Sequence, residues 1–250
     1  MTDRRIALLL TRPLAQSKGF VNIFEGVSQP SPVHICISPL FEIIFQGPLP
    51  EMSPYRSLIF TSSNGVRAFS QLKPSSILPS FTVGKVTAET AISVGLPAQM
   101  LGLDVQDFTE AILSLKPETP CLHLRGDISR SALATQLSNA GLATDEAIVY
   151  RQRGLPLTEE ARQILLGTDS VIVPLFSPRS AQRFRAEFVK TSGTAPIYGV
   201  ALSKAVATEM SGINLADLVV AKQPTATAMG KAINNLVATL IHLERAPVTK

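Results

Sequence analysis

The chain has 250 residues, of which 45% are hydrophobic, and its 23 lysines and arginines exceed its 19 acidic residues by four. A chain of this length can bury one large core or two smaller ones, and two domains fit the usual size of about 100 to 150 residues better. The positive excess is small and forms no long basic run. It therefore does not single out a nucleic acid as ligand, and a small acidic molecule fits as well.

The two cysteines predict a reducing environment. Cys36 and Cys121 lie far apart in the apolar stretches HICI and PCLHL, which is typical of buried free thiols rather than of a disulfide. We therefore expect a cytoplasmic protein. The N-terminal run IALLL is shorter than the about 7 to 15 apolar residues of a signal peptide, and no stretch approaches the roughly 18 of a membrane span, so we expect neither.

Strands and helices are predicted to alternate from the start of the chain. RIALLLTRP (5–13) reads as a buried strand that runs into a turn with Thr11 and Arg12, and LAQSKGFVNIFEGV (14–27) has the apolar spacing of an amphipathic helix. The apolar run at 58–60 then leads through the turn FTSSNG into a helix-like stretch. Further along, PCLHLRGD and ISRSALATQLSNAGL (120–142) repeat the first strand and helix, with Arg125 in the place of Arg12.

A second set of matches indicates an internal duplication. IFTSSNGVRAF (59–69) aligns with PLFSPRSAQRF (174–184) at an offset of 115, which superposes Ser62 on Ser177. Gly84 and Gly199 share this offset, while Thr109 and Thr225 match at 116. The strand and turn with Arg12 and the strand and turn with Arg125 accompany two sets of turns rich in Ser, Gly and Thr, one in each half of the chain. The sequence allows the segment with Arg12 to share a domain with either set.

The alternation predicts an α/β fold with two similar lobes, each a parallel sheet flanked by helices. SPVHICIS (31–38) and AIVYRQR (147–153) both read as extended and are candidates for two strands that link the lobes. In that case lobe one comprises residues 1–34 and 153–250, lobe two comprises residues 38–149, and the linker strands are 35–37 and 150–152.

Small hydroxyl residues gather where strands are predicted to end. Ligands of open α/β sheets bind there, where helix N-termini present free N–H groups. Each such residue could instead be an ordinary helix N-cap. The candidate ligand-binding residues in these turns are the hydroxyl residues Thr11, Thr61, Ser62, Ser63, Thr87, Ser177, Ser203 and Thr225 and the amide residue Asn64.

Charged and aromatic candidates accompany these turns. Arg12, Arg125 and Arg179 could bind carboxylates of a ligand or pair with local acids, and Gly126 follows Arg125 at the end of its strand. Tyr150 lies on the second extended stretch. A phenol with a pKa near ~10 is protonated at neutral pH and can donate a proton in a closed cleft, or it can simply pack against a lobe.

Several common sites are excluded by spacing. Gly84-Lys85 would need a glycine at position 79 and a serine or threonine at 86 to form a P-loop, but the chain has Pro79 and Val86. No G-x-G-x-x-G or G-x-S-x-G motif follows a predicted strand. The three histidines have no Cys, Asp or Glu at metal-ligand spacing, so we expect neither a metal nor a nucleotide cofactor.

Taken in order, these segments resemble the uroporphyrinogen-III synthase family. The resemblance extends from Ile6 to about Leu240, and the segments that carry it are LLLTRP, FTSSNGV, VGKVTAETA, LHLRGD, VYR, FSPRS and PTA. It implies two α/β lobes on a two-stranded linker, with the N-terminal segment in the C-terminal lobe. One departure stands out, because GVALSKA offers only Ser203 where many members have a Gly-x-x-Thr-Ala turn.

The resemblance also implies an activity. Members cyclise hydroxymethylbilane, a linear tetrapyrrole, with loss of water and inversion of the last ring. They use no cofactor or metal and act as monomers, without nucleic acid or membrane, and the partner that the resemblance allows besides the substrate is the preceding bilane-forming enzyme, in transient contact. Tyr150 matches the family's candidate for the proton donor to the leaving hydroxyl. A two-lobed receptor and a tetrapyrrole sensor without turnover are the alternatives, and a product that differs from the ligand would exclude both.

Overall fold

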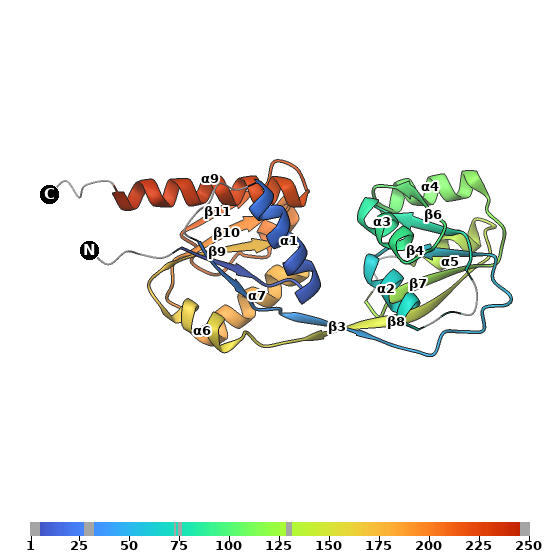
Figure 1. Ribbon diagram of the computed structural model, residues 1–250, viewed down its shortest axis with the longest axis horizontal. Coiled ribbons are helices and arrows are strands. Elements are labelled where there is room, and N and C mark those ends of the chain that lie inside the picture. The colour runs from blue at the N-terminus through green and yellow to red at the C-terminus, as the bar shows by residue number, and fades with distance from the viewer. Residues whose placement is uncertain (1–5, 28–32, 73, 75–76, 129–131, 246–250) are drawn as a thin grey trace. The chain divides into compact units, whose positions relative to one another are not determined.

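The computed structural model describes residues 6–27, 33–72, 74, 77–128 and 132–245. The chain divides into two compact units (Figure 1). The first consists of Met1–Glu42 and Gly154–Lys250, and the second of Ile43–Arg153. The N-terminal segment therefore shares a unit with the C-terminal part of the chain.

The first unit is built on a sheet of five strands in the order β11-β10-β9-β1-β2, and every neighbouring pair is parallel. β1 (IALLL) and β9 (SVIVPL) are buried along their whole length. Such apolar runs are typical of strands that are covered on both faces of a parallel sheet. The strands are β1 (Ile6–Leu10), β2 (Val33–Ile37), β9 (Ser170–Leu175), β10 (Ile197–Ala201) and β11 (Asp217–Val220).

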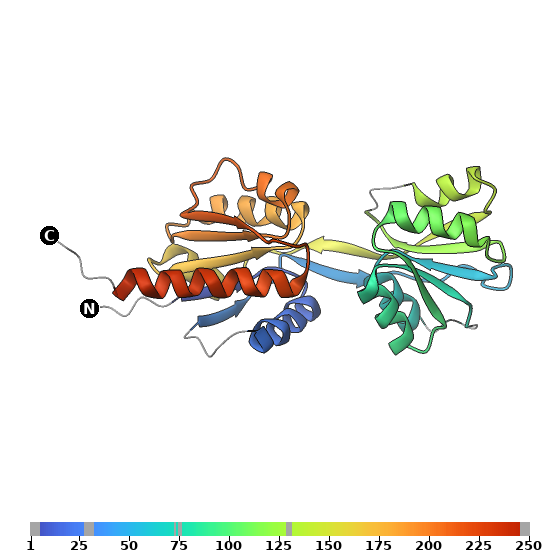
Figure 2. The same ribbon diagram turned by 90° about the horizontal axis from the view of Figure 1, so that it is seen from above.

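Helices cover both faces of this sheet (Figures 1 and 2). Successive side chains of a strand point to opposite faces, so Leu8 and Leu10 pack with α1 and α9, whereas Leu9 packs with α6 and α7. The helix predicted at 14–27 is confirmed at both ends. None of the helices in the described part of the chain is long and apolar enough to span a membrane. The helices are α1 (Leu14–Val27), α6 (Glu159–Leu166), α7 (Pro178–Thr191), α8 (Lys204–Thr208) and α9 (Ala226–Arg245).

The second unit has a six-stranded sheet in the order β3-β8-β7-β4-β5-β6, which is parallel from β8 to β6. Leu58 and Phe60 pack with α2 and α3 on one face, and Ile59 packs with α4 and α5 on the other. The strands are β3 (Phe41–Phe45), β4 (Ser57–Phe60), β5 (Ser80–Val83), β6 (Ala98–Gly102), β7 (Cys121–Gly126) and β8 (Thr144–Gly154). The helices are α2 (Ser63–Gln71), α3 (Lys85–Ser93), α4 (Val105–Leu115) and α5 (Leu133–Asn139).

Both units carry the same series of four βα segments, which supports the predicted duplication. In sheet order, β1, β9, β10 and β11 of the first unit correspond to β7, β4, β5 and β6 of the second. Ser62 and Ser177 are both helix N-caps, and Phe69 and Phe184 are both fully buried. The predicted α/β fold with parallel, helix-flanked sheets is confirmed.

Two of the pairings drawn from the sequence are wrong. Gly84 is the N-cap of α3, whereas Gly199 lies inside β10, so the position equivalent to Gly84 is Ser203, the N-cap of α8. Thr109 lies inside α4 and donates its hydroxyl hydrogen to the Val105 carbonyl, whereas Thr225 directly precedes α9. Insertions in the loops shift these segments by a few residues, which a constant offset does not follow.

The expected linker strand at 35–37 is also misplaced. These residues belong to β2, which pairs with β1 inside the first sheet. The strand that lies beside β8 is β3, and the chain passes between the units within β3 and again near the end of β8. Residues 33–37 pair with β1, and Cys36 lies in the core of the first unit, so their apolar pattern belongs to a sheet strand rather than to a linker.

The glycine of FTSSNG is required by close packing. A Cβ atom at Gly65 would lie 2.7 Å from the Leu124 carbonyl oxygen on β7. We expect Gly65→Ala to push α2 away from the sheet and to lower the free energy of unfolding by roughly 1–3 kcal/mol, measured by urea denaturation. Gly19→Ala is the control, because nothing lies within 4 Å of that site in α1, and alanine there should stabilise the helix slightly. Equal effects of the two substitutions would contradict this packing.

Candidate functional site

In the first unit, the predicted hydroxyl residues lie at one edge of the sheet. Thr11, Ser177, Ser203 and Thr225 follow β1, β9, β10 and β11, which are four adjacent parallel strands. Parallel strands end at the same edge, so these residues and the N-termini of the following helices gather there. Such an edge presents backbone N–H groups that attract anions.

The hydroxyls at this edge are used in different ways. The Ser177 Oγ accepts a hydrogen bond from the Ser180 N–H at 3.2 Å, and the Thr225 Oγ1 accepts one from the Ala228 N–H at 3.2 Å. These two residues are therefore N-caps. Ser203 makes no side-chain cap bond, and the buried Thr11 hydroxyl has no partner among the described residues. Neither hydroxyl therefore serves as a helix cap here.

Arg12 is held by an aromatic ring rather than by an acid. Its guanidinium carbon lies 4.1 Å above the centre of the Phe176 ring, in a cation–π contact. Burial lowers its pKa to about 10, so it is still charged at neutral pH. Among the described residues no carboxylate forms an ion pair with it. Arg179 lies over Phe41 at 4.7 Å.

The second unit repeats this arrangement and adds Tyr150. Thr61, Ser62, Ser63 and Asn64 span the end of β4 and the start of α2, and Thr87 is buried in α3 after β5. Ser62 caps α2, because its Oγ accepts a hydrogen bond from the Asn64 N–H at 3.2 Å. The remaining candidates of this unit, Arg125, Gly126 and Tyr150, lie on the neighbouring strands β7 and β8.

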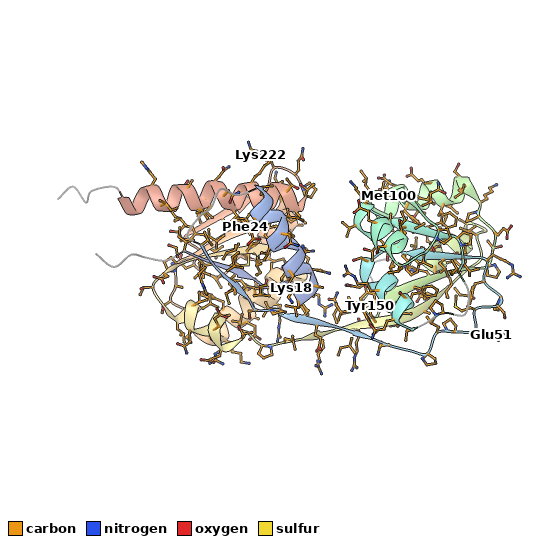
Figure 3. The ribbon with its side chains drawn as sticks, viewed as in Figure 1. Lys18, Phe24, Glu51, Met100, Tyr150 and Lys222 are labelled. Atoms are coloured by element: carbon orange, nitrogen blue, oxygen red, sulfur yellow. The ribbon has the colours of Figure 1, made fainter. Side chains whose placement is uncertain are left out.

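The Tyr150 side chain reaches the turn after β4. Its ring covers Gly126, since a Cβ atom there would lie 2.6 Å from ring carbons, and the Ser62 side chain lies close enough to its hydroxyl to affect its pKa. Figure 3 shows Tyr150 on β8 beside α2. Burial raises the pKa of Tyr150 above its usual value of 10, and the nearby Ser62 side chain offsets this only in part. The phenol therefore stays protonated at neutral pH and can serve as a donor.

Arg125 forms a local ion pair. Its guanidinium donates to the Glu146 carboxylate and, at 2.8 Å, to the Gly126 carbonyl. The carboxylate raises the pKa of Arg125, and the guanidinium lowers the pKa of Glu146. Of the two possibilities left open for the arginines, Arg125 thus pairs with a local acid and Arg12 does not.

Two contacts at these edges were not foreseen from the sequence. The buried His123 on β7 has its Nε2 atom 3.2 Å from the Thr61 Oγ1 atom, and Phe176 lies under Arg12. A histidine inside the apolar run CLHL is a weak signal for a buried partner. Within the described ranges, His, Cys, Asp and Glu side chains form no group of three that could hold a metal ion.

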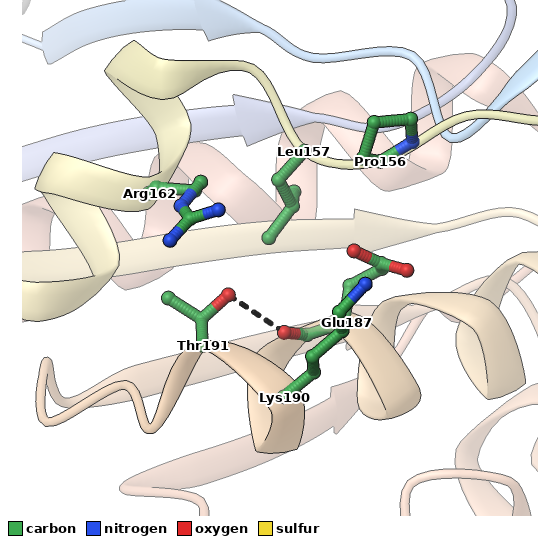
Figure 4. Close-up of a pocket in the computed structure, with 6 residues that line it drawn as sticks. All are labelled: Pro156, Leu157, Arg162, Glu187, Lys190 and Thr191. Atoms are coloured by element: carbon green, nitrogen blue, oxygen red, sulfur yellow. Dashed lines mark hydrogen bonds between the residues drawn. The ribbon is translucent and has the colours of Figure 1, made fainter.

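A cavity of about 100 Å³ lies elsewhere in the first unit (Figure 4). Its wall includes Thr191 at the C-terminal end of α7, whereas Ser177 caps the other end of this 14-residue helix. The two ends are roughly 20 Å apart at 1.5 Å per residue. None of the predicted site residues borders the cavity. The lining residues are Pro156, Leu157, Arg162, Glu187, Lys190 and Thr191.

The fold and these edges define a duplicated α/β protein with hydroxyl turns and helix N-termini suited to an anionic ligand. The chain belongs to the uroporphyrinogen-III synthase HemD family, whose model matches residues 33–231. It is therefore a cyclising lyase of tetrapyrrole biosynthesis. A comparison with curated protein sequences found no significant match.

Solved structures agree on the fold. The uroporphyrinogen-III synthetase of Helicobacter pylori is 20% identical, with a TM-score of 0.65, and the match covers 93% of this chain and 99% of that one. A mutant uroporphyrinogen III synthase from Thermus thermophilus is 14% identical, with a TM-score of 0.51 and coverage of 94% and 99%. At these identities the likeness concerns the fold alone.

The two equivalent caps provide a matched pair of substitutions. We expect Ser62→Ala and Ser177→Ala each to lower the free energy of unfolding by about 1 kcal/mol in urea denaturation, because each removes an N-cap. Turnover should change only mildly in both, since the backbone N–H groups remain. Loss of the Ser62 hydroxyl also leaves Tyr150 protonated. Complete loss of activity in a folded Ser62→Ala protein would instead assign Ser62 a direct chemical role.

Proposed function

We propose that the chain converts hydroxymethylbilane into uroporphyrinogen III at the carboxyl edges of its two sheets. The observation that carries the proposal is the buried Tyr150, whose ring lies against Gly126 and whose hydroxyl lies near Ser62 in a chain of this family. A tetrapyrrole sensor would need neither a buried phenol at this place nor a change in the ligand. The geometry therefore favours turnover.

The substrate carries eight carboxylates, which call for many dispersed donors. In the first unit we assign this role to Arg12, which has no acidic partner among the described residues, to Arg179, and to the hydroxyl turns. In the second unit the helix N-termini after β4 and β5 serve the same purpose. The proposed binding residues are Thr11, Arg12, Thr61, Ser62, Ser63, Asn64, Thr87, Gly126, Ser177, Arg179, Ser203 and Thr225. Arg125 acts through its ion pair with Glu146, by fixing the end of β7.

Tyr150 is the proposed proton donor. Its phenol hydrogen passes to the terminal hydroxyl of the bilane, which leaves as water and produces a cationic azafulvene. The substituted carbon of the last ring attacks this cation and forms a spiro intermediate, and fragmentation and recombination then close the inverted macrocycle. The phenolate regains a proton as the new ring loses one, so the protein is unchanged at the end.

Positioning of the substrate has to supply most of the rate acceleration. The bilane closes unaided without inversion, so the protein must favour one folded conformer over others. Orientation can lower a barrier by ~7 to 11 kcal/mol, whereas a general acid contributes ~10² to 10⁴-fold in rate. Loss of Tyr150 should accordingly impair the reaction without abolishing it.

Other features of the function are proposed on the same basis. We propose that the reaction needs no metal or cofactor and that the chain works as a monomer, with at most transient contact with the enzyme that forms the bilane. A cytoplasmic location is supported by the two free, buried cysteines. Burial raises the pKa of Cys36 to about 12, so this thiol stays unreactive at neutral pH.

The first experiment compares Tyr150→Phe with the wild-type protein. We expect the substitution to lower turnover of hydroxymethylbilane at least tenfold, because it removes the acidic hydrogen and keeps the ring over Gly126. The rate of bilane loss is measured with each protein and without protein. Tyr198→Phe on β10 is the matched control and should turn over normally.

Two outcomes would count against the proposal. A folded Tyr150→Phe protein with nearly wild-type turnover would remove Tyr150 from the mechanism. Bilane loss that is no faster with wild-type protein than without it would contradict the proposed activity itself.

A further inference from the structure

His123 is a buried imidazole that the mechanism above does not use. It is 1% exposed on β7 and lies two residues before Arg125. Burial lowers its pKa to about 4, and the opposing effect of Glu146 is smaller. The ring is therefore neutral at pH 7, with a single hydrogen on one of its two nitrogens.

The two ring nitrogens have different surroundings. Nε2 lies 3.2 Å from the Thr61 Oγ1 atom, whereas Nδ1 is buried and has no hydrogen-bond partner among the described residues. If the hydrogen were on Nδ1, a buried N–H donor would be left without an acceptor, which is unfavourable. If it is on Nε2, the donor is satisfied by Thr61 and only a lone pair is left unused, which proteins tolerate better.

The tautomer decides what Thr61 can do. When Nε2–H donates to the Thr61 Oγ1 atom, the hydroxyl acts as the acceptor in this bond, and its own hydrogen points elsewhere. No described residue accepts that hydrogen. Thr61 is half-buried directly after β4, at the edge where α2 begins. Its hydrogen is thus available to an acceptor from outside the chain.

We propose that His123 is a positioning residue that holds the Thr61 hydroxyl as a hydrogen-bond donor for a carboxylate of the substrate. The inference rests on the proposed function, because the anionic acceptor is taken from it. His123 itself touches no substrate. It fixes the direction in which Thr61 donates, one residue before Ser62, whose side chain lies near the Tyr150 hydroxyl.

The tautomer of the His123 ring is measured directly in the wild-type protein by ¹⁵N NMR of labelled imidazole groups at pH 7. The chain has three histidines, so His34→Gln and His242→Gln proteins assign the signals. The expected result is a neutral His123 ring with its hydrogen on Nε2. A hydrogen on Nδ1, or a charged ring, would overturn the proposal whatever the protein catalyses.

A double-mutant cycle tests the consequence for the substrate. We expect Thr61→Val and His123→Leu each to raise the KM for hydroxymethylbilane about five- to tenfold while kcat changes less than twofold. The double variant should be no worse than Thr61→Val alone, because both changes remove the same donor. His123→Gln, whose amide can donate from nearly the same place, should restore KM to within twofold of wild type.

A purely structural role for His123 predicts a different pattern. Partial unfolding would lower apparent kcat without raising KM, and the two effects would multiply in the double variant. Either result would overturn the proposal. Thr82→Val is the control for loss of a buried hydroxyl on the neighbouring strand β5 and should leave KM unchanged.

Two further results keep the test decisive. If His123→Leu does not fold, the proposal is tested by the KM values of Thr61→Val and His123→Gln and by the tautomer of His123. An unchanged KM in Thr61→Val would then contradict it. If the wild-type protein does not consume the bilane, the proposed function fails, while the NMR result still shows whether His123 donates to Thr61.

Discussion

The parallel direction of the strands is the constraint on which the site depends. Because β1, β9, β10 and β11 run the same way, and β7, β4, β5 and β6 do so as well, each sheet collects its turns at one edge. The helix N-termini at these edges supply N–H donors without any particular side chain. The duplication then provides two such edges in one chain. Conserving the strand order is enough to keep them, even where individual hydroxyl residues differ.

Among the candidate site residues of the second unit, neutral hydrogen-bond donors outnumber free charges. Arg125 is neutralised by Glu146, His123 is kept neutral by burial, and burial raises the pKa of Tyr150 so that it keeps its proton. In the first unit Arg12 stays charged against Phe176. We propose that such a site binds a flexible polyanion through directed hydrogen bonds more than through a strong local field. That arrangement suits an enzyme whose main task is to select one folded conformer of its substrate.

Local patterns in the sequence predicted the elements well, but not their neighbours. The helix at 14–27 followed from apolar spacing alone, and Ser62 and Ser177 were matched correctly because cap, turn and helix are local. Residues 35–37 were assigned to a linker because periodicity shows that a strand is buried and not which strand lies beside it. The hydrogen bond between His123 and Thr61 and the approach of Tyr150 to Ser62 join segments about 60 to 90 residues apart, and no local pattern encodes such contacts.

The most direct test of the central claim is the identity of the product. Purified protein is supplied with freshly generated hydroxymethylbilane, and the porphyrin isomers are separated by chromatography after oxidation. The account predicts that the type III isomer predominates, because the protein holds the bilane in the conformer that inverts the last ring. Formation of the type I isomer alone, which is the product of unaided closure, would contradict it.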